Sequence, residues 1–391
     1  MGEPEEAEAL HCIPGWNTSP GSSSQMQKDD HLLAPDEIED LIRQVKLNSN
    51  ISDAKFWGSY SICGLLMRYR ELYRNEHALM PWDVIDHKEV SSWIHERETL
   101  WKKLEDLELQ KIVIRGGVYD PFDVNSLNAR LRAAGLIYGS GYGMFNKPTF
   151  FIARLEAVRD LFDYPVHYAG SELCRDIAST PAMLQGRCIY VRREIILSFI
   201  WDRFQELKAN RFGFLTEMMF SHYGIGRPDE ACPELFAKIR RLAADVAELF
   251  IMHEAGEAYE DEYSGEWHEM LGEGCGKATE LFLRAIKDIR ADTSPLGPLR
   301  AVTGAKNLPL LGCFVALMDG IRREIAPEIR EAFQVFSHSM DWSGIERARL
   351  AVYQRSSRLQ SEVVRIWSES RQQSAIAEYV RIMSAGMRQG E

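Results

Sequence analysis

The spacing of apolar residues predicts a mostly helical protein that begins after a polar tail. Residues 1–34 contain proline, glycine, serine and acidic residues without an apolar period, which is typical of a disordered segment. The Pro-Asp-Glu sequence starting at Pro35 resembles the first turn of a helix, where acidic side chains are favoured. A broad apolar stripe predicts a long helix over 53–76, and a capping residue at Asp86 predicts another that ends near residue 107.

The helical pattern stops between residues 110 and 191. Short runs of β-branched and aromatic residues predict strands there, at 111–115, 136–138, 149–152, 166–168 and 188–191. A glycine-rich stretch at 139–143 separates two of these runs and predicts the turn of a hairpin. We therefore expect a small β-rich insert over about 110–191.

From residue 192 onward, apolar residues again recur every three or four positions. This period predicts helices over 194–207, 234–262, 266–291, 310–336 and 345–384. Connections rich in proline or glycine separate several of them. The predicted fold class is mainly α: one multi-helix globular domain from residue 35 to 391, with the β-rich insert inside it.

The charge balance limits the partners of the chain. It carries 58 acidic and 46 basic residues, for a formal net charge of −12. Binding to a nucleic-acid backbone or to an anionic membrane needs a basic surface, so we expect neither partner. No apolar run approaches the ~18 residues that span a bilayer. The seven cysteines contain no Cys-x-x-Cys pair, and the opening residues do not resemble a secretory signal; both favour the reducing cytoplasm.

Two glycine clusters resemble nucleotide-binding loops but depart from them. After the glycines of 139–143, Met144 occupies the position of the third glycine of the dinucleotide-binding pattern. The sequence 272–277 ends like a phosphate-binding loop. However, Leu271 and Ala278 occupy the positions of its first glycine and of its serine or threonine. We expect no nucleotide site at either cluster.

One group of chemically active residues lies late in the helix predicted over 234–262. Its apolar stripe continues through Val246 and Phe250 to His253 and Glu257, so both side chains share the buried face, one turn apart. A buried carboxylate needs a partner, because leaving it unpaired costs several kcal/mol. We therefore expect Glu257 to contact His253, an arginine of another helix or a metal ion.

The sequence His-Glu-x-x-Glu differs by one residue from the zinc-protease motif His-Glu-x-x-His. Mapped onto that motif, His253 and Glu257 are metal ligands and Glu254 is the general base. His222 and His268 are the candidates for further metal ligands. A carboxylate in place of the second histidine makes the donor set harder, so that zinc, iron and manganese all fit as the divalent ion.

These residues predict a metal-dependent enzyme, most simply a hydrolase that acts on a small molecule or a peptide. By analogy with zinc proteases, the strand at 188–191 is expected to lie at the edge of the sheet and to hold the substrate. A metal-dependent oxidase or oxygenase in a helical pocket is the second interpretation. The third is a non-catalytic scaffold or pathway accessory protein. Residues 242–276 contain ten acidic residues and no lysine or arginine, and such a face suits a basic protein partner.

Plainer structural interpretations stay open for the same residues. His253 and Glu257 can form a buried pair that only stabilises the fold. Gly256, between them, costs a helix about 1 kcal/mol relative to alanine, and close packing of another helix explains it more simply than an approaching ligand. Lys147, beside the glycine-rich hairpin, is either an anion contact or, more simply, a structural residue.

Several stretches of the chain resemble an uncharacterised bacterial protein family. The stretches that carry the resemblance are 64–73, 119–124, 181–186 and 253–257. The resemblance covers roughly residues 56–336, and it implies that this region forms one folded unit. It implies no reaction, fold or ligand.

Overall fold

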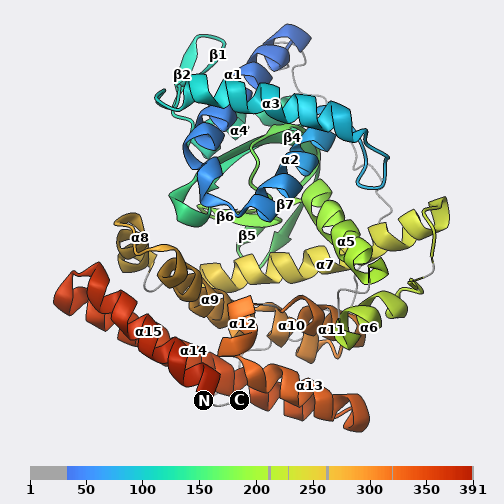
Figure 1. Cartoon of the computed structure of the whole chain (residues 1–391), viewed down its shortest axis with the longest axis vertical. Coiled ribbons are helices and arrows are strands. Elements are labelled where there is room, and N and C mark those ends of the chain that lie inside the picture. The colour runs from blue at the N-terminus through green and yellow to red at the C-terminus, as the bar shows by residue number, and fades with distance from the viewer. Residues whose placement is uncertain (1–32, 210–212, 228, 261–263, 319, 390–391) are drawn as a thin grey trace.

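The structure is a computed structural model that describes residues 33–209, 213–227, 229–260, 264–318 and 320–389. The tail predicted over 1–34 lies outside these residues, except for its last two positions. The first helix, α1, begins at Pro35 as predicted, and the Glu37 carboxylate accepts a hydrogen bond from the Ala34 N–H over 2.7 Å. The prediction of a mainly α fold with a small β-rich insert is confirmed (Figure 1).

The helices before the sheet are α1 (Pro35–Phe56), α2 (Ile62–Glu76) and α3 (His87–Leu104). The single helix predicted over 53–76 is therefore wrong, because two helices meet within it. Ser61 starts the second of them, since its hydroxyl accepts a hydrogen bond from the Gly64 N–H over 3.2 Å. Asp86 caps α3 as predicted and accepts a hydrogen bond from the Lys88 N–H over 2.8 Å.

The predicted β insert contains a two-stranded hairpin and a five-stranded sheet, with helix α4 (Val124–Leu131) between them. The strands are β1 (Ile112–Ile114), β2 (Gly117–Tyr119), β3 (Leu136–Tyr142), β4 (Pro148–Leu161), β5 (Tyr164–Arg175), β6 (Ala182–Gln185) and β7 (Cys188–Arg192). The sheet order is β3-β4-β5-β7-β6, and only β5 and β7 pair in parallel. The sheet is curled, so that its outer strands β3 and β6 approach each other. The approach is close at Gly141 of β3, where a Cβ would lie 2.2 Å from Nε2 of Gln185 in β6.

Two details of the sheet differ from the sequence prediction. Gly139 and Gly141 lie within β3, and the turn of the hairpin follows at 143–147. Gly139 is required there because a Cβ would lie 2.1 Å from the Phe151 ring of the neighbouring strand. The prediction of an edge strand at 188–191 is wrong as well, since β7 lies between β5 and β6 and leaves β6 as the outer strand.

From residue 193 the chain is helical, as predicted. The helices are α5 (Arg193–Lys208), α6 (Phe214–His222), α7 (Pro233–Tyr259), α8 (Ser264–Gly272), α9 (Lys277–Thr293), α10 (Pro298–Gly304), α11 (Leu308–Leu317), α12 (Gly320–Ile325), α13 (Pro327–Ser339), α14 (Trp342–Ser370) and α15 (Gln373–Gln389).

Three of the predicted helices are each divided by turns: 266–291, 310–336 and 345–384. Gly274 and Gly276 have positive φ in the loop between α8 and α9, and Arg371 has a φ of 50° where α14 ends. These predictions were too long because the apolar period continues across each break. The loop that resembles a phosphate-binding loop connects two helices, so no strand precedes it.

Helix α7 lies between the sheet and the C-terminal helices (Figure 1). Its buried side chains, among them Leu242, Val246 and Ile251, belong to a core that extends from β5 to α15. Its neighbours include α5, α9, β6 and β7, so it connects the two halves of the molecule. Among the described helices, none is long and apolar enough to cross a membrane.

Candidate functional site

Helices α7 and α9 lie close together because Gly256 has no side chain. A Cβ on Gly256 would lie 2.4 Å from the Ala291 carbonyl oxygen of α9. Close packing of another helix, the simpler of the two explanations for a glycine at this position, is therefore what the structure contains. The contact brings the turn of α7 that contains His253 and Glu257 against the matching turn of α9.

His253, Glu257 and Asp288 form what we call the ligand group, because their potential metal-binding atoms all lie within 4.8 Å of one another. His253 Nε2 lies 3.6 Å from Glu257 Oε1, while His253 Nδ1 lies 2.8 Å from Asp292 Oδ1. Lys287 Nζ donates to the other oxygen of Glu257 over 2.7 Å. His253 and Glu257 therefore each have one atom held by a partner outside the ligand group and one atom that faces the other ligand-group side chain. Metal-binding histidines commonly have such a carboxylate partner.

The pKa values of His253 and Glu257 are set by each other and by their outer partners. Burial alone would lower the pKa of His253, but the Asp292 and Glu257 carboxylates raise it well above its usual value. Burial alone would raise the pKa of Glu257, but Lys287 and His253 hold it well below its usual range. A metal ion must therefore displace a proton from His253 before it can bind there.

Unlike Glu257, Glu254 and Asp288 have carboxyl groups with raised pKa values, and burial is the main cause in both. The pKa of Glu254 reaches about 7, because the Glu257 carboxylate adds to the effect of burial, whereas a backbone hydrogen bond from Leu184 of β6 opposes it. Glu254 is 9% exposed and lines a pocket. A carboxyl group with a pKa near 7 is suited to proton transfer at neutral pH.

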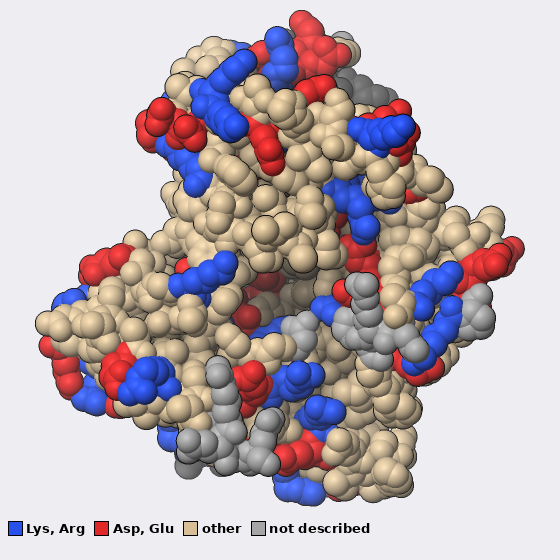
Figure 2. All heavy atoms as spheres, viewed as in Figure 1, with Lys and Arg blue, Asp and Glu red and all other residues tan. Residues whose placement is uncertain are grey.

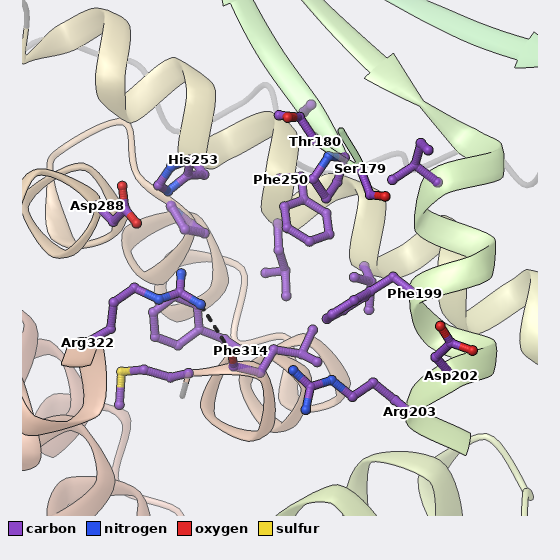
Figure 3. Close-up of a pocket in the computed structure, with 18 of the residues that line it drawn as sticks. Ser179, Thr180, Phe199, Asp202, Arg203, Phe250, His253, Asp288, Phe314 and Arg322 are labelled. Atoms are coloured by element: carbon purple, nitrogen blue, oxygen red, sulfur yellow. Dashed lines mark hydrogen bonds between the residues drawn. The ribbon is translucent and has the colours of Figure 1, made fainter. Parts of the chain in front are cut away.

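The pocket has a volume of 660 Å³, within the range of small-molecule sites. Figure 2 shows the molecule hollowed at the centre of this face, between the part that contains the sheet and the C-terminal helices. His253 and Asp288 lie on one side of the pocket, and Asp202 and Arg203 lie on the other (Figure 3).

Residues 176–181, which we call the wall segment, connect β5 to β6, and 179–181 line the pocket. Lys147 Nζ lies 2.9 Å from Asp53 Oδ1 and 3.2 Å from Asp176 Oδ1. Asp53 also accepts a hydrogen bond from the Ile177 N–H over 3.2 Å. Lys147 therefore contacts two buried carboxylates of its own chain, and these fix the start of the wall segment.

Comparison with known protein families gives two matches along the chain. Residues 40–192 match the N-terminal domain of a family of unknown function, DUF6866, and residues 197–384 match its C-terminal domain. The chain belongs to the DUF6866 family. No curated protein and no solved structure matches it significantly.

The two DUF6866 domain matches meet between residues 192 and 197, where β7 leads into α5. Arg68 and the wall segment of the N-terminal DUF6866 domain line the pocket. His253 and Arg322 of the C-terminal domain line it as well. It therefore lies between the two family domains, and residues of both would contact a molecule bound there.

The other predicted metal ligands lie elsewhere. His222 ends α6 and is exposed, with its ring 5.6 Å from that of Tyr223. His268 is an exposed residue of α8. Neither belongs to the ligand group, so the structure brings together His253 and Glu257 but not these two histidines.

Sequence reasoning missed Asp288 and Asp292, although both were visible in the pattern. They lie four residues apart on the amphipathic helix α9, the same spacing that singled out His253 and Glu257 on α7. The spacing shows that the two carboxylates share a helix face. It does not show which helix that face packs against.

Proposed function

We propose that this DUF6866 protein is a metal-dependent enzyme, most simply a hydrolase, that acts on a small molecule in the pocket. His253, Glu257 and Asp288 would bind a divalent ion, and Glu254 would be the general base. The observation that carries the proposal is the ligand group beside the pocket, in which Asp292 orients His253.

The donor set fits zinc, iron or manganese, since imidazole suits transition metals and carboxylates suit harder ions. Ligand atoms about 2.0–2.2 Å from a zinc ion lie roughly 3–3.6 Å apart. His253 Nε2 and Glu257 Oε1, at 3.6 Å, are close to that separation. Asp288 would supply the third ligand atom, which lies within 4.8 Å of the other two.

Glu254 has the position and acidity that a general base needs. It follows His253 directly, lines the same pocket and is almost fully buried. With a pKa of about 7 it can accept a proton from a water molecule in the pocket at neutral pH. The bound ion would supply positive charge to polarise the substrate.

The same donor set also supports a second candidate, a metal-dependent oxidase or oxygenase. Sites with histidine and carboxylate ligands and open positions hold iron(II) in oxygenases, and Phe199 and Phe250 give this pocket an apolar wall. Iron in the purified protein together with oxygen consumption would favour this candidate. Zinc together with hydrolysis would favour the first.

The acidic residues of 242–276 give less support to a scaffold that binds a basic partner. Among the described ones, Glu248 pairs with Arg159, Glu260 with Arg290, and Glu269 with Arg371. Much of the acidic face is thus neutralised by basic residues of the same chain.

The test is elemental analysis of protein purified without chelator and then incubated with zinc, iron(II) or manganese. We expect close to one ion per chain in the wild type and its loss in His253→Ala and Glu257→Ala. His222→Ala and His268→Ala are matched controls that should keep the ion. Glu254→Gln should keep the ion but lose hydrolytic activity.

A wild-type protein that binds none of the three ions would refute the proposal. If His253→Ala and Glu257→Ala then also lower the thermal stability strongly, the pair is structural. Circular dichroism of each variant checks that a missing ion does not reflect a missing fold.

A further inference from the structure

Arg322 is held in place beside the ligand group. Its Nη1 lies 3.6 Å from Asp292 Oδ2, and its Nη2 donates to the Leu317 carbonyl oxygen over 3.2 Å. Figure 3 shows its side chain extending from α12 into the pocket, on the same side as His253 and Asp288. Because two partners already fix the guanidinium, it can meet a bound group without a large loss of side-chain entropy.

The middle of the pocket is apolar. Phe199 and Phe250 lie edge to face, with ring centroids 6.3 Å apart, and Phe314 of α11 also lines the pocket. These side chains would cover an apolar or aromatic body of a ligand that reaches from the wall segment to Arg322.

The charges around the ligand group disfavour a cationic ligand there. Lys287 pairs there with Glu257 and Arg322 with Asp292, and a bound divalent ion would compensate the Asp288 carboxylate. A positive group on the ligand would therefore find no uncompensated carboxylate at this end of the pocket.

We propose that the substrate carries an oxyanion, a carboxylate or a phosphate, that binds to the guanidinium of Arg322, joined to an apolar body that packs against Phe199, Phe250 and Phe314. The proposal names the substrate class for the proposed function and rests on it. Arginine is suited to this role because its planar N–H groups match the geometry of carboxylate and phosphate oxygens. Its position next to the ligand group would direct the bond beside the oxyanion toward the ion.

The test compares three probes of nearly equal shape by calorimetric titration into zinc-loaded protein: phenylpropionate, phenylpropanol and phenylpropylamine. We expect phenylpropionate to bind about tenfold or more tightly than phenylpropanol, the effect of a charge-assisted hydrogen bond, and phenylpropylamine to bind most weakly. Arg322→Gln should remove the preference for the carboxylate. Phe199→Ser should weaken all three probes alike.

Arg347→Gln is the matched control, since Arg347 is 71% exposed on α14 and does not line the pocket. The proposal is overturned if the wild type prefers the amine, if all three probes fail to bind at millimolar concentration, or if the carboxylate preference survives in Arg322→Gln. Zinc content measured on each sample separates the two proposals. Zinc-loaded protein without a carboxylate preference overturns the oxyanion site alone. Protein that binds none of zinc, iron(II) and manganese, but has a preference that depends on Arg322, overturns the metal-dependent function and supports the oxyanion site.

Discussion

Lys147 allows a direct test of how the wall segment of the pocket is held. Its ammonium group lies between Asp53 and Asp176, and the three side chains are at most 3% exposed. Burial alone would lower the pKa of Lys147, but the two carboxylates raise it, so the group is charged. Methionine would keep most of the side-chain volume and remove the charge, leaving two carboxylates facing each other in the interior.

We expect Lys147→Met to lower the free energy of unfolding by about 3–5 kcal/mol, the usual cost of removing one partner of a buried ion pair. Lys111→Met is the matched control, because Lys111 makes an even shorter contact, of 2.6 Å, with Asp120 where the two side chains are 59% and 50% exposed. Exposed pairs of this kind contribute less than about 1 kcal/mol. The difference between the two variants therefore measures the effect of burial.

The loss should also depend on pH. Burial raises the pKa of Asp53 to about 6 even with Lys147 present, and removal of the ammonium raises it further. A carboxyl group whose pKa is raised above its unfolded value of about 3.9 stabilises the fold at low pH, and this stability is lost as the pH rises through the folded pKa. The gap between Lys147→Met and the wild type should thus widen from about pH 6 to about pH 8.

Urea unfolding, followed by circular dichroism and tryptophan fluorescence at both pH values, gives the two free energies. A loss in Lys147→Met no larger than that in Lys111→Met would refute the argument from burial. If the difference in unfolding free energy between Lys147→Met and the wild type stays constant with pH, the two unpaired carboxylates are not the cause of the loss.

Two further predictions concern the contact between α7 and α9. Gly256→Ala should destabilise the protein by about 1–3 kcal/mol in thermal unfolding, because its Cβ would meet the Ala291 carbonyl oxygen. Gly386→Ala, on an exposed turn of α15 with no atom near the new Cβ, should not, and equal effects would contradict the packing argument. Zinc affinity, measured by calorimetry after chelator treatment, should rise with pH above about 6.5, because His253 has a raised pKa and must lose its proton. An affinity independent of pH would exclude His253 as a ligand.

The sequence predicted the helices well where one apolar stripe continues over many turns, as in α5 and α7. It failed where helices end without a strong local signal. Arg371 ends α14 with a φ of 50°, a conformation that is unusual for a residue other than glycine, and its side chain contacts Glu269 of α8. Tertiary contacts of this kind decide where a helix ends, and the periodicity of the sequence does not contain them.

The candidate site was predicted in part for a similar reason. His253 and Glu257 belong to one turn of one helix, so their proximity follows from the sequence alone. Asp288 and Arg322 join them only because α9 packs against α7 and α12 packs against α9. His222 was chosen for its residue type, and no local pattern shows that α6 lies away from the pocket.

Buried charges are the feature that sequence analysis represented least well. Lys147 follows an ordinary turn, and Asp53 is one of several polar residues late in α1. Average behaviour places such residues at the surface, since lysine and aspartate are rarely buried unless they are paired. Lys147 and its partner Asp53 are 94 positions apart in the chain, and pairing over that separation is a property of the fold.

Ion pairs hold both sides of the pocket in the same manner. On one side Asp292 and Lys287 each fix one atom of a ligand-group side chain, and on the other Lys147 holds the carboxylates that bind the wall segment. Buried pairs contribute little net stability, because apolar residues of similar size often do as well or better. What they provide is position, since each hydrogen bond fixes one polar atom in or beside the pocket wall. This arrangement is therefore better explained by a requirement for placed polar groups in the pocket than by a requirement for stability.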